Sequence, residues 1–369
     1  MESTPSLQFK LRDYEIPIFT QFVLDARKKL GSGTFGDVYL GTKLGNREEQ
    51  FAIKLETKSS KYSKNKYHSI LKKEDEIYKV LKDVERIPKI HGFGDQGTYH
   101  ILIIDLLGHS LKDLMTYIKS PFSLGTTLKL SLQILDILKE IHKKGIVLRY
   151  IKPGNMAMGR GINKDYVYLF DFGLAKKYIK NGAHIPYKEN KDYLGNRDFI
   201  SIKTHSGVQI SRRDDIESLG YNLVYFMKGE LPWSKLRKSE YIKSKKIETS
   251  LDELCEGLPE EFKEFIKYAR NMEFTEEPDY EYLKNLLLKT AKKNNIEIDS
   301  VKYDWDIYDE KLNNNKNKKE KEIKENDVKS DTKTEEKKQI STKNCEEDIK
   351  GKEDNLIVVF DEKFDLNDE

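Results

Sequence analysis

The chain has 369 residues, enough for one large domain or for two lobes. Its 66 basic and 63 acidic residues leave a formal net charge of +3, and this balance argues against a general nucleic-acid binder. The two cysteines, Cys255 and Cys345, lie far apart and outside any metal-ligand spacing. The chain begins without a signal-peptide core and has no run of 18 apolar residues, so we expect a reduced cytoplasmic protein without membrane contacts.

Residues 1–22 have no clear hydrophobic period and are expected to form an extended leader. Two β-rich runs then flank the glycines Gly31, Gly33 and Gly36. Glycines in such a hairpin let backbone amides approach a polyphosphate, although a purely structural hairpin explains the pattern equally well. The run after the third glycine contains Val38 and reads as a strand, whereas a helix would follow in a dinucleotide site.

A lysine lies inside the apolar strand predicted at residues 51–55, and a lysine in such a run is either exposed at an edge or paired with a buried partner. The next predicted helix offers Glu74 and Glu76. At about 100° per residue, Glu74 lies near the centre of the apolar face of this helix and Glu76 points away from it. Because burying a lone carboxylate is costly, we predict an ion pair between Lys54 and Glu74, with a partly solvated Glu74 as the alternative.

An apolar strand is predicted to end near Asp105, followed by Leu106, Leu107 and a glycine. A short helix over residues 110–119 and a long one over residues 123–144 come next. The leucines of the long helix recur at helical spacing and are typical of a core face. Gly145 is well placed to end this helix.

Most of the polar chemistry lies in two segments, Leu148–Asn155 and Asp171–Gly173. The first contains Lys152 and Asn155, and the predicted strand over residues 166–170 delivers Asp171. Asn155 and Asp171 supply the hard oxygen atoms that Mg²⁺ prefers.

Taken with Lys54 and the three glycines, these segments resemble those of a protein kinase. Three further motifs are Ser211-Arg-Arg-Asp-Asp-Ile-Glu-Ser-Leu-Gly-Tyr221, Gly229-Glu-Leu-Pro-Trp233 and Ser201-Ile202-Lys203. With these motifs the chain resembles the casein kinase I group, and the resemblance covers about residues 24–306. Within this group, the segment over residues 199–207 resembles the vaccinia-related kinase branch.

The resemblance implies an α+β, bilobal protein kinase fold. A small β-rich N-lobe would span about residues 23–105 and a larger helical C-lobe about residues 109–308, with ATP and Mg²⁺ or Mn²⁺ in the cleft. The residues at catalytic positions are Lys54, Glu74, Lys152, Asn155 and Asp171, of which Asn155 and Asp171 would hold the metal. The residues at nucleotide-binding positions are Leu30, Gly31, Ser32, Gly33, Gly36, Val38, Ala52, Lys54, Asp105 and Leu107. Asp215 is implied to bind the backbone of the catalytic loop.

The catalytic loop departs from the family pattern. Tyr150 occupies the position of the aspartate that accepts the proton of the substrate hydroxyl, Leu148 that of a histidine, and Asn196 that of a threonine that braces the aspartate. A phenol with a pKa near 10 is a poor base near neutral pH, and losing a general base slows a reaction by about 10²- to 10⁴-fold.

We therefore expect a monomeric, ATP-binding pseudokinase that acts through contacts with a protein substrate or partner. An active serine/threonine kinase is the alternative, and a scaffold that binds no nucleotide is a third reading.

Residues 309–369 are expected to form a charged, low-complexity, disordered tail, because they contain few apolar residues to bury. The basic run Lys316–Lys319 reads as a solvated charge run, with a nuclear signal as the alternative. The apolar stretch Leu356–Phe360 is either a β-type docking segment or an incidental apolar stretch.

Overall fold

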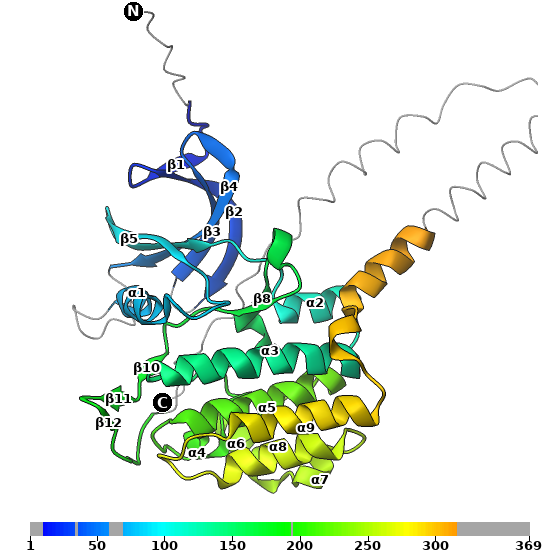
Figure 1. Cartoon of the computed structure of the whole chain (residues 1–369). Helices are drawn as coiled ribbons and strands as arrows, with labels where there is room; N and C mark the ends of the chain where they lie inside the picture. Colours follow the sequence, from blue (N-terminus) through cyan, green and yellow to red (C-terminus); the bar gives the residue numbers. More distant parts are fainter. Residues whose placement is uncertain (1–9, 34–35, 59–68, 193–194, 316–369) are drawn as a thin grey trace, which may run out of the picture.

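A computed structural model describes residues 10–33, 36–58, 69–192 and 195–315 of the chain (Figure 1). Within them the chain forms a small lobe built on an antiparallel sheet and a larger lobe of packed helices. This is the expected α+β bilobal kinase architecture.

The sheet of the N-lobe has the strand order β1-β2-β3-β4-β6-β5, and every neighbouring pair is antiparallel. Its strands are β1 (Glu15–Ile18), β2 (Phe22–Gly33), β3 (Gly36–Lys43), β4 (Asn46–Thr57), β5 (Ile90–Gln96) and β6 (Tyr99–Asp105). Helix α1 (Ile70–Leu81) contacts β5 and β6. Its buried face includes Leu71, Glu74, Ile77 and Tyr78, and Glu76 is exposed, as the helical period predicts.

The predicted leader over residues 1–22 contributes a strand to this sheet, so the expected domain start at residue 23 is too late. Strand β1 pairs with β2 in the register Glu15↔Asp25 to Ile18↔Phe22. An arginine secures the start of β1, because Arg47 on β4 donates to both carboxylate oxygens of Glu15, at 3.0 and 2.9 Å. Arg47 and Glu15 lie 32 residues apart in the sequence, so no local period signals their contact.

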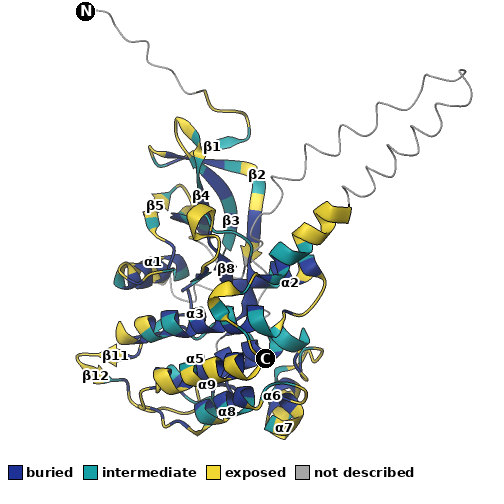
Figure 2. Ribbon diagram, turned by 45° about the vertical axis from the view of Figure 1, so that its right-hand side comes forward, coloured by how far each residue is buried: buried dark blue, intermediate teal, exposed yellow. Residues whose placement is uncertain are grey.

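The C-lobe is organised around α5 (Arg212–Lys228), most of whose residues are buried (Figure 2). This helix packs against α3 (Leu124–Lys143) and α8 (Glu260–Asn271). The other helices of the lobe are α2 (Leu111–Ile118), α4 (Ile202–His205), α6 (Ser239–Glu248), α7 (Leu251–Leu254) and α9 (Tyr280–Lys293).

Local sequence signals account for the ends of α2 and α3. Ser110 and Asp113 form a capping box at the start of α2. The Ser123 side chain accepts a hydrogen bond from the backbone N–H of Thr126 and caps α3. Gly145, with φ +75°, follows the end of α3, because a left-handed conformation is easily reached by glycine.

Short strands position the loops between the lobes. They are β7 (Ile146–Val147), β8 (Met156–Met158), β9 (Val167–Leu169), β10 (Lys176–Lys177), β11 (Ile179–Lys180) and β12 (Ala183–His184). Strand β8 pairs with β9, and β7 pairs with β10. These two ladders bracket Leu148–Asn155 and Asp171–Gly173, so the two chemically interesting segments lie side by side.

A last helix over residues 304–315 crosses the predicted boundary between the domain and the tail at residue 308. Trp305, near its start, packs edge-on against Phe122 and stacks on Tyr303, at centroid distances of 5.6 and 4.4 Å. The rest of the predicted tail, with Lys316–Lys319 and Leu356–Phe360, lies outside the described residues. Among the described helices, none has the length and apolar character needed to cross a bilayer.

Candidate active site

The glycine hairpin lies at the turn between β2 and β3, where Gly33 pairs with Gly36. Gly36 has φ +134°, and a Cβ added there would lie 1.9 Å from the carbonyl oxygen of Leu55. Only glycine allows this close approach of β3 to β4. Ser32 is exposed beside the turn, and its Oγ donates to Asp37 Oδ1 at 2.8 Å.

The predicted ion pair between Lys54 and Glu74 is present, and a second carboxylate joins it. Lys54 Nζ lies 2.7 Å from Glu74 Oε2 and 2.9 Å from Asp171 Oδ1. Lys54 is 7% exposed and Glu74 1% exposed. One ammonium therefore ties β4, α1 and the segment after β9 together in the cleft between the lobes.

The three charges shift one another's proton affinities. Burial lowers the pKa of Lys54, but Asp171 and Glu74 outweigh it, so the pKa lies above its usual value. Burial raises the pKa of Glu74, and the negative charge of Asp171 adds to this effect, whereas Lys54 opposes it. Two carboxylates thus share one cation, an arrangement that a further positive charge at Asp171 would relieve.

The backbone at Asp171 adopts an uncommon conformation, with φ +64°. The next residue, Phe172, donates its backbone N–H to Glu74 Oε1 at 3.3 Å, and its ring packs edge-on against Tyr78 at 4.8 Å. These contacts with α1 hold the turn and aim the Asp171 carboxylate at Lys54.

Asp215 on α5 braces the start of the catalytic loop, as the family resemblance implies. Its Oδ2 accepts the backbone N–H of Leu148 at 2.7 Å, and its Oδ1 accepts that of Arg149 at 2.8 Å. His142 Nε2 lies 2.9 Å from Oδ2. Arg149 has φ +69°, and strained residues of this kind persist only where their surroundings hold them.

The ring of Tyr150 lies over the ammonium of Lys152. Lys152 Nζ is 4.7 Å from the centroid of the Tyr150 ring, and Lys152 is only 7% exposed. The Tyr150 ring therefore covers the Lys152 ammonium. At the position of Tyr150, other kinases have a small carboxylate.

Asn196 forms hydrogen bonds with the backbone of its own turn. Its Oδ1 accepts the backbone N–H of Asp198 at 2.9 Å, and its carbonyl accepts those of Phe199 and Ile200 at 3.0 Å each. A side chain occupied in this way caps the local backbone. In the family pattern a threonine stands at this position and braces the catalytic loop.

Asn155 and Asp171 offer a donor set that suits Mg²⁺ together with phosphates. Asn155 Nδ2 donates to the carbonyl of Tyr150 at 3.1 Å, an amide orientation that leaves Oδ1 as the acceptor. Among the described residues, no group of three or more His, Cys, Asp or Glu side chains could hold a metal. Such a two-ligand set fits Mg²⁺, which is often bound by one or two protein side chains, substrate phosphates and water.

The predicted adenine-facing residues lie together in one apolar cluster. Leu30, Val38 and Ala52 are at most 3% exposed, and Ile104 at the end of β6 belongs to the same cluster. At the hinge, the Asp105 N–H already donates to the carbonyl of Lys89 at 3.0 Å, and its carboxylate bonds His91 and the Lys89 N–H. Within the described part of the chain the Leu107 N–H makes no hydrogen bond, so Leu107 is the available hinge donor.

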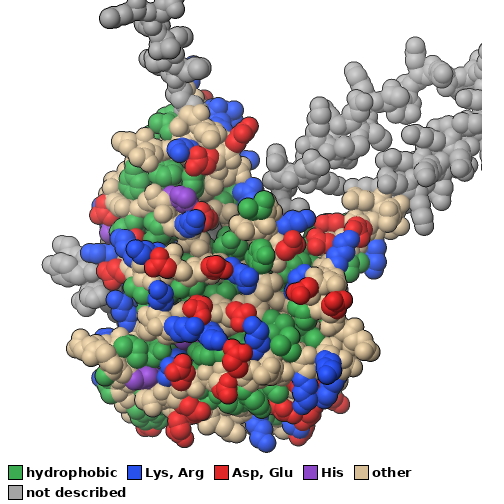
Figure 3. Space-filling view, viewed as in Figure 1, with side chains coloured by type: hydrophobic (Ala, Val, Ile, Leu, Met, Phe, Trp, Pro, Cys, Tyr) green, Lys and Arg blue, Asp and Glu red, His purple; other side chains and the backbone are tan. Residues whose placement is uncertain are grey.

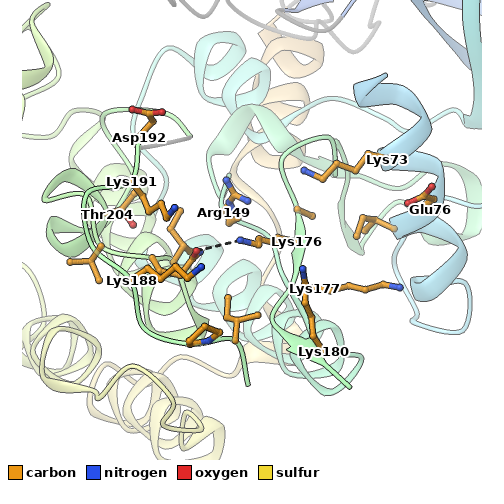
Figure 4. A pocket seen from close by; sticks show the side chains of 17 residues that line it. Lys73, Glu76, Arg149, Lys176, Lys177, Lys180, Lys188, Lys191, Asp192 and Thr204 are labelled. Atoms are coloured by element: carbon orange, nitrogen blue, oxygen red, sulfur yellow. Dashed lines mark hydrogen bonds between the residues drawn. The ribbon is translucent and has the colours of Figure 1, made fainter. Parts of the chain in front are cut away.

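A hollow of about 760 Å³ lies beside Arg149 and was not predicted from the sequence (Figure 4). Its lining residues come from α1, the catalytic loop, β10, β11 and the segments over residues 185–192 and 204–210. The sequence contains five lysines between residues 176 and 191, and this run could have indicated a basic site. The sequence does not show that these lysines converge with Lys73 and Arg149.

The fold and the cleft define the class of this protein. A glycine hairpin, a lysine bridging two carboxylates and a braced loop meet between a β-rich and a helical lobe, which is the organisation of a protein kinase. A family model described as "Protein kinase domain" matches residues 24–294, and the chain belongs to this family. Protein kinase domains in general use ATP and a divalent metal ion.

Proposed function

We propose that this protein is a casein kinase I-group member that binds Mg-ATP, transfers phosphate weakly or not at all, and acts through protein contacts. The observation that carries the proposal is the contact between Tyr150 and Lys152, 4.7 Å from ring centroid to Nζ. An aromatic ring there replaces the proton acceptor and also covers the cation beside it.

Nucleotide binding is supported by the residues around the cleft. Lys54 is held by Glu74 and Asp171, as required of a lysine that contacts the α- and β-phosphates. Leu30, Val38 and Ala52 would enclose the adenine, and Leu107 would donate to it. Gly31, Gly33 and Gly36 would let the hairpin backbone approach the phosphates.

Asn155 and Asp171 would hold the metal ion, which neutralises phosphate charge when bound. Asp171 keeps one carboxylate oxygen on Lys54, so its second oxygen is the one available to a cation.

Weak transfer follows from the chemistry of Tyr150. A phenol takes up a proton poorly near pH 7, because its conjugate base is scarce below pH 10. Losing the general base alone lowers the rate by about 10²- to 10⁴-fold, and the ring adds a steric obstacle. Asn196 replaces the bracing threonine of the family pattern, and its Oδ1 accepts the backbone N–H of Asp198.

An active serine/threonine kinase is the second candidate, and the assembled ion triad favours it. Phosphoryl transfer depends chiefly on positioning and electrostatics, which Lys54, Lys152 and the metal ligands could still provide. A protein substrate would then approach from the C-lobe side of the cleft.

The partner is proposed to be another protein, with the chain itself a cytoplasmic or nuclear monomer of the vaccinia-related branch. Acidic and basic side chains alternate over the face shown in Figure 3, so that face offers no broad single-sign surface for nucleic acid.

The deciding experiment measures transfer of labelled phosphate from ATP to a generic protein substrate and to the chain itself, with Mg²⁺ and with Mn²⁺. The Asp171→Asn variant is the control, because it removes a metal ligand. Signal at the level of this control supports the proposal. Signal that the control abolishes shows that the enzyme works without an aspartate at position 150, and the second candidate then holds.

Nucleotide binding is tested separately by thermal unfolding with and without Mg-ATP. A ligand at 100 times its Kd stabilises the native state by about 2.7 kcal/mol, which raises the unfolding temperature. An unchanged temperature at saturating Mg-ATP would contradict both candidates and leave a scaffold that binds no nucleotide.

A further inference from the structure

The start of α1 is held by a carboxylate from the neighbouring sheet. None of the described residues over 70–73, which form the first turn, is acidic. A helix leaves its first backbone N–H groups without partners inside the helix, and these groups attract negative charge. Glu56 on β4 supplies that charge, because its Oε1 accepts the N–H of Ile70 at 3.1 Å and its Oε2 that of Leu71 at 2.9 Å.

Ser69 completes this arrangement as the N-cap of α1. Its Oγ donates to Glu56 Oε2 and accepts the backbone N–H of Lys72 at 3.0 Å. Glu56 and Ser69 together thus satisfy the first three N–H groups of the helix. Glu56 is 5% exposed, and a carboxylate buried to this degree needs such partners.

Lys54 and Glu56 reach α1 from the same face of β4. They are two residues apart on the strand, so their side chains point to the same side of the sheet, and both are buried. The intervening Leu55 packs against the apolar cluster on the opposite face. Strand β4 is therefore joined to α1 at two points, through the ion pair of Lys54 with Glu74 and through the contact of Glu56 with the helix start.

The spacing of these two points is matched on the strand and on the helix. Two residues of a strand rise by about 6.6 Å, and four residues of a helix, from Ile70 to Glu74, rise by about 6 Å. Both contacts can therefore form at once while β4 and α1 run past each other. Two fixed points determine the orientation of α1 as well as its distance from the strand, which a single ion pair does not.

The connection from β4 to α1 does not impose this geometry. Strand β4 ends at Thr57 and α1 begins at Ile70, and a segment of that length can span many separations between its ends. Helix α1 also packs on β5 and β6, beside the sheet in Figure 1, but apolar packing is non-directional. A directional contact at the start of the helix is thus needed to fix where Glu74 lies.

We propose that Glu56 is a positioning residue, which holds the start of α1 on β4 so that Glu74 meets Lys54. Glu74 also accepts the backbone N–H of Phe172 at 3.3 Å, so the position of α1 bears on the segment that carries Asp171. The inference deepens the proposed function and rests on it for its consequence, because an ordered Lys54 is what would bind the phosphates of ATP.

The first measurement is hydrogen exchange of the full chain without nucleotide, in the wild type and in Glu56→Gln. Glutamine has a similar shape, but it carries no charge and keeps only one acceptor oxygen. The amides over residues 74–78 should exchange at least about tenfold faster in the variant, because two hydrogen bonds to a charged acceptor are weakened. A cap with only a local role would affect the first turn alone, so unchanged exchange over residues 74–78 would overturn the proposal.

Ser69→Ala is the milder variant, and it keeps the test decisive if Glu56→Gln does not fold. It removes one contact to Glu56 and the cap on Lys72, so exchange over residues 74–78 should rise in the same direction. Asp279→Ala is the matched control, because Asp279 caps α9 in the other lobe by accepting the Tyr282 N–H at 2.9 Å. The control should leave exchange in α1 within about twofold of the wild type. An equal rise in the control would show general destabilisation and overturn the proposal.

Nucleotide binding separates this inference from the proposed function. Calorimetry compares Mg-ATP with adenosine, which lacks the phosphates. Glu56→Gln should weaken binding of Mg-ATP at least about tenfold and of adenosine less than about twofold. Adding Glu74→Gln should weaken Mg-ATP binding by no more than about twofold further, because both substitutions act through Lys54.

Equal weakening for Mg-ATP and adenosine, or fully additive effects of Glu56→Gln and Glu74→Gln, would overturn the positioning role. A wild-type chain that binds neither ligand contradicts the proposed function alone. The exchange measurement, which needs no nucleotide, then decides whether Glu56 positions α1.

Discussion

The ammonium of Lys152 lies 4.7 Å from the centroid of the Tyr150 ring, so the residue that replaces the usual proton acceptor also contacts the neighbouring cation. A cation–π contact of this kind is worth about 0.5–2 kcal/mol, depending on burial. It gives the tyrosine a defined place in the cleft, where its bulk as well as its proton affinity affects transfer.

Replacing Tyr150 by aspartate should restore a base and uncover Lys152. If only the base is missing, phosphate transfer should rise by about 10²- to 10⁴-fold, measured with labelled ATP under saturating Mg²⁺. Tyr150→Phe is the control, because it keeps the ring and should leave transfer unchanged. No rise in Tyr150→Asp, nor in Tyr150→Asp combined with Asn196→Thr, would mean that the cleft is remodelled beyond these two positions.

The Asp215→Asn variant should destabilise the domain by about 2–4 kcal/mol, because one of two charge-assisted backbone hydrogen bonds is lost and a buried N–H is left unpaired. Urea unfolding measures the change. Asp136→Asn removes an exposed pair with Lys284 and should change stability by less than about 1 kcal/mol. Similar effects of the two variants would argue against Asp215 as the brace of the loop.

The Gly36→Ala variant should lose more stability than Gly45→Ala, although both positions have positive φ, at +134° and +86°. A Cβ at Gly36 would lie 1.9 Å from the Leu55 carbonyl, whereas nothing lies within 4 Å of one at Gly45. We expect about 1 kcal/mol at Gly45 from backbone strain alone, and at least about 2 kcal/mol more at Gly36. Equal losses of unfolding free energy in urea would show that the hairpin backbone accommodates a Cβ at Gly36 without additional cost.

His205 should make the domain sensitive to acid. Burial, then the charge of Lys246, lowers its pKa from 6.5 to about 3, while its Nε2 bonds the Arg197 carbonyl at 3.0 Å. Between these pKa values the unfolded chain binds a proton that the folded chain does not. The contribution of His205 to the free energy of unfolding is therefore complete above pH 6.5. It decreases as the pH is lowered from 6.5 to about 3.

This loss should reach about 1.4 kcal/mol per pH unit for the one proton. His205→Gln does not titrate, so its unfolding free energy should fall less steeply between pH 6.5 and 4. Parallel pH profiles for the two proteins would contradict the assignment.

Several features could be predicted from local patterns, from the high free energy of a lone buried charge and from the spacing of motifs along the chain. The helical period of α1 separates Glu74 from Glu76, and the ion pair with Lys54 follows from the high free energy of a lone buried carboxylate. Ser123 and Gly145 bound α3 through local capping. The spacing of the glycines, Lys54, Asn155 and Asp171 indicates the kinase family, to which residues 24–294 belong.

Other features depend on contacts between residues far apart in sequence. Strand β1 lies in the predicted leader and has no clear period of its own, and the Arg47–Glu15 contact, between residues 32 apart, helps to hold it in the sheet. The identity of Tyr150 could be read from the chain, but its position over Lys152 could not, because side-chain orientation depends on the braced loop. The hollow beside Arg149 joins Lys73, Arg149 and Lys188 from three separate segments. Local propensity reflects only adjacent residues, whereas the packing of the two lobes determines which distant charges meet.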